Sequence, residues 1–258
     1  MKSDFTTKKN IYLLTFSDKN YRFSAKRLVR QAKKFDVFRK IYSCTKSEID
    51  NDFKSKYKKI LDCKRGAGYW IWKPYLIDKY LKNLDYGDFL LYLDAGCSLN
   101  KKGLNRFFDY IKILEESDQG IISFDLKLPE YQYTNRACFE YFNWPKQDIY
   151  NGQLMATVLF MRKNDLLCEQ ITSWLNVVKE NVNLFTDELT NNEIKDFKFH
   201  RHDQSIFSLI RKKYKPLILE DETYFKDFKS KKALRFPIHA TRIGDTKKLF
   251  LKYYLRLL

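Results

Sequence analysis

The chain of 258 residues carries a formal net charge of +17, with 44% hydrophobic and 17% aromatic residues. This composition excludes an intrinsically disordered chain and is sufficient for a substantial core. The five cysteines are widely spaced without a Cys-x-x-Cys pair, which excludes a disulfide framework and a zinc knuckle and favours a reducing, cytoplasmic location. The polar N-terminal segment predicts no signal peptide, and no apolar run approaches the roughly 18 residues of a membrane span.

The excess of positive charge has two interpretations. It indicates an anionic partner, such as nucleic acid, an acidic membrane surface or a phosphorylated substrate. It is equally explained by a composition rich in Lys, Asn, Ile, Tyr and Phe, as AT-rich coding produces, with no partner implied.

Strands and helices are predicted to alternate along the chain. Apolar runs predict strands at 10–18, 38–45, 87–97, 120–126, 155–163 and 216–220. Helical spacing predicts helices at 20–35, 47–61, 75–84, 103–116, 135–143, 164–181, 202–214 and 247–258. Ser47 and either Asn164 or Asp165 are the predicted N-caps, and 181–199 is the predicted mobile loop. Uniformly apolar strands that alternate with helices predict an α/β fold with a mostly parallel sheet covered on both faces.

The segment "RGAGYWIWKP" (65–74) places Tyr69, Trp70 and Trp72 beside two glycines. Glycine permits close backbone approach, and aromatic faces can stack on a base or on a sugar. Alternatively, both tryptophans pack in the core and Pro74 starts a helix.

The strand "FLLYL" delivers Asp94 into the small residues "AGC". Ligands of open α/β sheets bind beyond the carboxyl ends of the strands. A carboxylate there suits a divalent cation or a ribose hydroxyl, although it could also cap the following turn.

"FLLYLDAGC" resembles the metal-binding segment of GT-A glycosyltransferases, in which a strand ends in a D-x-D motif. The chain departs from that motif, because Asp94-Ala95-Gly96 carries one acid. "NGQLMATVLFMRK", "HRHDQSIFSLI" and "PIHATRIGD", which follow one another in this order along the chain, resemble further segments of the glycogenin and lipopolysaccharide galactosyltransferase family and of the blood-group transferase family. Together with "GYWIWKP", they resemble bacterial glycosyltransferases of capsule and lipopolysaccharide loci. The resemblance implies one GT-A-like, Rossmann-like domain at 1–246, followed by a basic amphipathic tail at 247–258.

The resemblance also implies roles for individual residues. Asp203 would hold a sugar hydroxyl and Gln204 would face the anomeric carbon, so both are the candidate catalytic residues. Asp94 and His239 would bind Mn²⁺ or Mg²⁺. The candidate donor-binding residues are Arg65, Gly68, Tyr69, Trp70, Lys73, Asp94, Ala95, Gly96, Arg242 and Lys247. The candidate acceptor residues are Arg136 and Gln153.

The sequence therefore predicts a glycosyltransferase that moves a sugar from a nucleotide-diphosphate donor, a UDP-sugar, to a glycan or lipid-linked saccharide in surface polysaccharide synthesis. The "HDQS" segment favours retention of configuration, with Glu130 or Asp125 as the alternative base of an inverting enzyme. The basic tail predicts peripheral binding to the anionic inner face of a membrane, or a helix that docks on the fold.

Two other functions compete with this one. A nucleic-acid-binding protein is allowed by charge and aromatics, but the cations are dispersed and no specific nucleic acid is expected. A nucleotidyltransferase would have a glycine-rich loop after the first strand, where this chain reads "TFSDKNYRFS".

Overall fold

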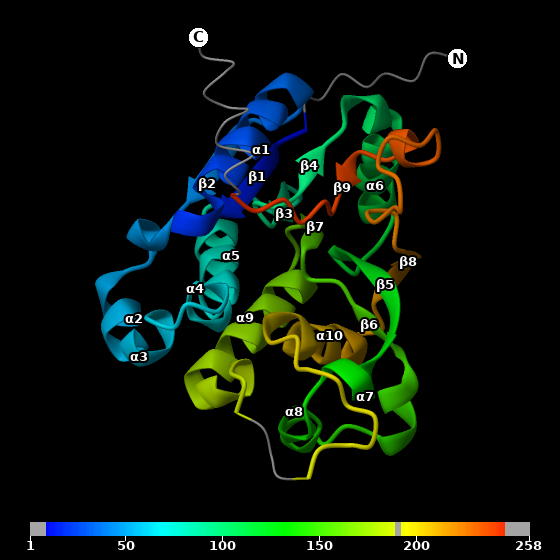
Figure 1. The fold of residues 1–258 in the computed structure, drawn as a ribbon. Helices are drawn as coiled ribbons and strands as arrows, with labels where there is room; N and C mark the ends of the chain where they lie inside the picture. The colour runs from blue at the N-terminus through cyan, green and yellow to red at the C-terminus, as the bar shows by residue number, and fades with distance from the viewer. Residues whose placement is uncertain (1–8, 189–191, 246–258) are drawn as a thin grey trace.

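A computed structural model describes residues 9–188 and 192–245 (Figure 1). The strands are β1 (Ile11–Phe16), β2 (Lys40–Cys44), β3 (Phe89–Leu93), β4 (Ser98–Leu99), β5 (Ile121–Pro129), β6 (Gly152–Leu154), β7 (Val158–Arg162), β8 (Leu217–Glu220) and β9 (Ile238–His239). The helices are α1 (Arg22–Phe35), α2 (Asn51–Lys56), α3 (Lys58–Leu61), α4 (Gly66–Tyr69), α5 (Trp72–Lys82), α6 (Leu104–Glu115), α7 (Glu130–Tyr133), α8 (Arg136–Tyr141), α9 (Asp165–Glu180) and α10 (Asp203–Lys213).

The central sheet has the order β2-β1-β3-β7-β5-β6, and β8 pairs with β5. The pairs β1–β2, β1–β3 and β5–β8 are parallel, whereas β3–β7, β5–β7 and β5–β6 are antiparallel. It follows that β1, β2, β3, β5 and β8 point one way and β6 and β7 point the other way. The predicted α/β fold with a mostly parallel sheet is confirmed, and the reversal of β7 is a feature that the sequence pattern did not predict.

Helices cover both faces of the sheet, which explains why β3 is apolar throughout. Phe89, Leu91 and Leu93 pack in one cluster with α1 and α6. Leu90 and Tyr92, on the opposite face, pack in a second cluster with α5, α9 and α10. Alternate residues of a strand point to opposite faces, so a strand between two layers must be apolar at every position.

Helix ends agree with the sequence at some positions and differ at others. The predicted cap Asn164 is confirmed, because its side chain accepts a hydrogen bond from the backbone N–H of Leu167 at 2.8 Å. The predicted cap Ser47 is wrong, because Thr45 caps a short 3₁₀ turn and the α-helix begins only at Asn51. The predicted helix 47–61 divides into α2 and α3 at Tyr57, whose backbone is not helical.

The predicted tail helix and the proposed boundary after residue 246 lie outside the described residues. Within the described ranges, no helix is long and apolar enough to cross a membrane. The predicted loop 181–199 contains a 3₁₀ turn at Val182–Phe185 in its described part.

Candidate active site

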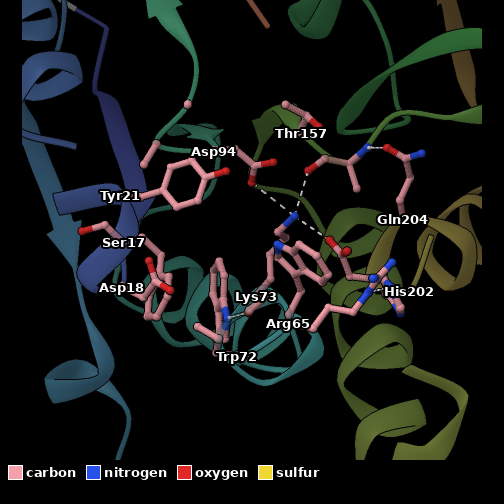
Figure 2. A pocket seen from close by; sticks show the side chains of 18 of the residues that line it. Ser17, Asp18, Tyr21, Arg65, Trp72, Lys73, Asp94, Thr157, His202 and Gln204 are labelled. Atoms are coloured by element: carbon pink, nitrogen blue, oxygen red, sulfur yellow. Dashed lines mark hydrogen bonds and ion pairs between the residues drawn. The ribbon is translucent and has the colours of Figure 1, made fainter. Parts of the chain in front are cut away.

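A cavity of about 560 Å³ lies over the carboxyl ends of β1 and β3 (Figure 2). β1 leads into Ser17 and Asp18, and β3 leads into Asp94. Opposite these strand ends lie α4 and the starts of α5 and α10. The cavity therefore occupies the position where open α/β sheets bind their ligands.

Asp94 is held at this edge by its neighbours. Its backbone N–H donates to the carbonyl of Thr157 at 3.0 Å, which joins the end of β3 to the start of β7. The hydroxyl of Tyr92 donates to Asp94 Oδ1 at 2.6 Å. The Asp94 side chain remains about one-third exposed (32%), so part of the carboxylate faces the cavity.

Lys73 forms the centre of the site. Its ammonium is 2.5 Å from Asp203 Oδ2 and 3.3 Å from Asp94 Oδ1, and it also donates to the carbonyl of Ala156 at 3.3 Å (Figure 2). Burial alone would lower the pKa of Lys73, but the two carboxylates outweigh it and raise that pKa. Burial raises the pKa of Asp203 to about 6, against the opposing effect of Lys73. Lys73, the predicted phosphate contact, is thus the centre of a carboxylate–ammonium–carboxylate cluster.

His202 lies at the start of α10 and packs against the rings of Tyr69 and Trp70. It occupies the position before the helix with a φ of 52°, and its Nδ1–H donates to the carbonyl of Phe185 at 2.9 Å. Its Nε2 accepts from Arg65 Nε at 2.8 Å. Burial lowers the pKa of His202 to about 4, so the imidazole is neutral at pH 7.

The two interpretations of "GYWIWKP" each apply to one tryptophan. Trp72 is buried and stacks on Phe16 with ring centroids 3.7 Å apart, as a core residue does. Trp70 is half-buried, lines the cavity and stacks on His202 at 5.2 Å. The ring centroid of Tyr69 lies 5.3 Å from that of His202, and Tyr69 does not line the cavity.

The glycines of this segment serve packing. A Cβ on Gly66 would lie 2.3 Å from the Trp70 ring, and one on Gly68 would lie 2.7 Å from Leu61 Cα. Both glycines have positive φ, which favours glycine. Gly68 does not line the cavity, so its predicted direct contact with the donor is not reproduced.

Gln204 lines the cavity with its amide held at both ends. Its Oε1 accepts from the backbone N–H of Ala156 at 3.2 Å, and its Nε2 donates to Gln153 Oε1 at 2.6 Å. Gln153 is fully buried and also donates to Glu130. Gln153, a candidate acceptor residue, therefore lies behind Gln204 and outside the cavity lining.

Two further predicted residues lie away from the cavity. Arg136 is an exposed residue of α8 that pairs with Glu140, so its predicted role at the acceptor is not supported. Glu130 is fully buried, where it accepts from Thr134, Ser208 and Lys212. A carboxylate with these partners cannot reach an acceptor hydroxyl as a base.

The predicted metal ligands do not form a metal site. His239 is buried, hydrogen-bonds the carbonyl of Ala233 at 2.8 Å and packs on Phe225 and Phe228, outside the cavity lining. Asp94 Oδ1 already accepts from Tyr92 and Lys73. In the described ranges, no group of three or more His, Cys, Asp or Glu side chains could hold a metal ion. This donor set does not fit Mn²⁺ or Mg²⁺, which require several oxygen ligands.

The position of the missing second acid is tightly packed. Gly96 is buried, and its carbonyl accepts from the backbone N–H of Ile243 at 3.1 Å. A Cβ at position 96 would lie 3.2 Å from Arg242 Cα and 3.3 Å from its carbonyl carbon. Arg242 therefore lies beside the Asp94 turn, whereas Lys247 lies outside the described residues.

The structure adds cavity residues that the sequence analysis did not select. Ser17, Asp18, Tyr21, Thr157 and Arg201 line the cavity. Arg201 lies inside the segment "HRHDQS", two positions before Asp203, so a basic residue within that motif was the available signal. Ser17 and Asp18 were recognisable as the polar end of the first strand.

No family model matches the chain, and no curated protein matches it. Among solved structures, the chain is similar to a glycosyltransferase involved in the glycosylation of the major capsid of PBCV-1. That match has 11% identity and a TM-score of 0.53, and it covers 89% of this chain and 92% of the other. The chain also matches galactosyltransferase LgtC, at 10% identity and a TM-score of 0.47, over 89% of this chain and 86% of the other. The first likeness shows that the fold resembles that of a glycosyltransferase.

Proposed function

We propose that this protein is a glycosyltransferase that uses a nucleotide-diphosphate sugar, a UDP-sugar, and transfers the sugar to a saccharide acceptor. The observation that carries the proposal is the cavity at the strand ends. It combines a buried carboxylate–ammonium–carboxylate cluster with arginine side chains, in a fold that resembles that of a glycosyltransferase. Carboxylates can accept hydrogen bonds from sugar hydroxyls, and guanidinium groups can hold phosphates.

The carboxylate cluster is suited to the donor sugar. Lys73 fixes one oxygen of Asp94 and one of Asp203, which leaves further lone pairs on both carboxylates for hydroxyl groups. The half-buried ring of Trp70 offers a face to the base or to the apolar side of the sugar.

Retention of configuration is the stereochemistry that we propose. Gln204 lines the cavity next to Asp203, and the hydrogen bonds at both ends of its amide fix its orientation. The two alternative bases are engaged elsewhere: Glu130 is buried, and Asp125 accepts from the backbone N–H of Lys127 at 2.8 Å. The negative charge that develops on the leaving diphosphate is then stabilised by preorganised cations of the cavity.

The acceptor that we propose is a glycan or lipid-linked saccharide of surface polysaccharide synthesis, on the cytoplasmic side of a membrane. The basic segment 247–258, "KKLFLKYYLRLL", would place the enzyme at an anionic membrane face. The same proposal divides the chain into a transferase domain at 1–246 and a basic amphipathic tail at 247–258.

The test is to measure nucleotide release from UDP-sugars, and transfer to saccharide acceptors, by the full chain and by Asp94→Asn. We expect Asp94→Asn to lower turnover by about a hundredfold or more, because the negative charge and one acceptor oxygen are removed from the reacting centre. Asp118→Asn, at an exposed position outside the cavity, is the matched control and should keep full activity. Full activity in Asp94→Asn would show that the site is misassigned, and NMR of the product anomer tests retention.

A further inference from the structure

Two arginines stand at a wall that two cavities share. A second cavity of about 320 Å³ adjoins the candidate active site, and Arg201, Arg242, Thr157 and Gln204 line both. Arg201 precedes α10, and Arg242 lies beside the Asp94–Gly96 turn. Two segments that are about forty residues apart in the chain thus bring two guanidinium groups to one place.

Neither guanidinium is paired with a carboxylate of the described residues. Across residues 9–188 and 192–245, no carboxylate forms an ion pair with Arg201 or Arg242. Arg65 differs, because it pairs with Asp187 and donates to His202. Arg65 and Lys73 are therefore neutralised by carboxylates, whereas Arg201 and Arg242 form no ion pair within the described residues.

The pair is held in place at an electrostatic cost. Arg201 Nε is buried and has no hydrogen-bond partner, which is uncommon for a buried polar atom. The Arg201 guanidinium lies over the Tyr133 ring at 4.7 Å and the Phe199 ring at 5.5 Å, and that of Arg242 lies 5.9 Å from the Tyr224 ring. Burial and the charge of Arg242 both lower the pKa of Arg201. An anion between the two groups would supply the missing acceptor and relieve their repulsion.

We propose that Arg201 and Arg242 hold the diphosphate of the nucleotide donor in place of a divalent cation. The inference rests on the proposed function, which supplies a diphosphate as ligand. It also rests on the misfit between the Asp94 turn and a metal, since Asp94 Oδ1 is engaged and Gly96 stands where a second acid would be needed. Arginine forks match phosphate oxygens in bidentate geometry and remain charged as the leaving group departs.

The experiment measures binding of UDP, GDP and dTDP to the full chain by calorimetry, in EDTA and again in Mn²⁺. We expect one of these diphosphates to bind with a dissociation constant that differs by less than about threefold between the two conditions. Arg201→Gln and Arg242→Gln should each weaken that binding by about tenfold or more, and should weaken the matching monophosphate less. Arg235→Gln, at an exposed position that lines neither cavity, is the matched control and should bind as the unmodified protein does.

The melting temperature without ligand provides a second readout. Removing one of two unpaired like charges should leave the melting temperature of Arg242→Gln unchanged or raised, so weaker binding cannot be ascribed to unfolding. A diphosphate dissociation constant that is more than about tenfold lower in Mn²⁺ than in EDTA would overturn the inference and leave the proposed function standing. Metal-free binding that neither arginine variant weakens would also overturn it. If no diphosphate binds with or without Mn²⁺, both the inference and the proposed function are wrong.

Discussion

The buried ammonium of Lys73 allows a quantitative test of the electrostatics of the site. Its side chain is 2% exposed and lies 2.5 Å from Asp203 Oδ2. Lys73→Met keeps most of the side-chain volume but leaves the Asp203 carboxylate, which is 7% exposed, without its counter-charge. Breaking a buried ion pair by removal of one partner typically costs about 3–5 kcal/mol, so we expect a loss of this size in the free energy of unfolding.

The loss should depend on pH in a defined direction. Burial raises the pKa of Asp203 to about 6 although Lys73 opposes the shift, so removal of Lys73 should raise that pKa further. A raised carboxyl pKa in the folded state means that stability is lost as the pH rises through it, because the unfolded group ionises near pH 3.9. The deficit of Lys73→Met relative to the unmodified protein should therefore be larger at pH 8 than at pH 5, where Asp203 can take up a proton.

Urea unfolding at pH 5 and pH 8 measures this deficit for Lys73→Met and for the double variant Lys73→Met/Asp203→Asn. The double variant should recover most of the loss at pH 8, because it removes the uncompensated charge. Lys79→Met is the matched control, since Lys79 is 36% exposed and its pairing with Asp50 should contribute less than about 1 kcal/mol. A deficit below about 1 kcal/mol at pH 8, or equal deficits at both pH values, would refute the reasoning.

The remaining predictions concern the tryptophans and the buried histidines. Trp72→Ala should lower the free energy of unfolding by about 3–5 kcal/mol because it removes the ring stacked on Phe16, whereas Trp70→Ala should cost less and instead weaken nucleotide binding, as urea unfolding and calorimetry would show. Burial lowers the pKa of His200 to about 3 and of His202 to about 4, below the unfolded value near 6.5. Stability present above pH 6.5 should therefore be lost as the pH falls toward 4, by about 1.4 kcal/mol per pH unit for each histidine. In urea unfolding, His202→Gln should reduce the dependence of the free energy of unfolding on pH by about 1.4 kcal/mol per pH unit. An unchanged pH dependence would contradict this explanation.

Local sequence patterns, such as apolar runs and cap residues, predicted much of the fold. The unbroken apolar run at Phe89–Leu93 could only be a strand between two layers, and its first polar residue, Asp94, marked the ligand edge of the sheet. The start of the apolar periodic segment offered Asn164 or Asp165 as its cap, and the structure selects Asn164.

Other features depend on long-range packing that one sequence does not encode locally. An apolar run has no readable direction, so the antiparallel course of β7 could not be predicted. Lys73 and Asp203 are separated by 130 positions, and each looked like an independent contact for phosphate or sugar until the fold paired them. Trp70 and Trp72 differ by two positions, and only the turn of α4 decides which ring enters the core.

Gly96, which stands where the D-x-D motif has its second acid, packs directly against the backbone of Arg242. Gly96 accepts from the backbone N–H of Ile243, and the backbone of Arg242 comes within 3.2 Å of where a side chain at position 96 would begin. A side chain there would require the backbone of Arg242 to shift by a few tenths of an ångström. A chain with this turn therefore combines one carboxylate, Asp94, with a guanidinium, where the D-x-D motif that it resembles combines two carboxylates. Position 96 thus offers no carboxylate, and the same close approach places a cation beside Asp94, where the leaving charge of the proposed reaction would develop.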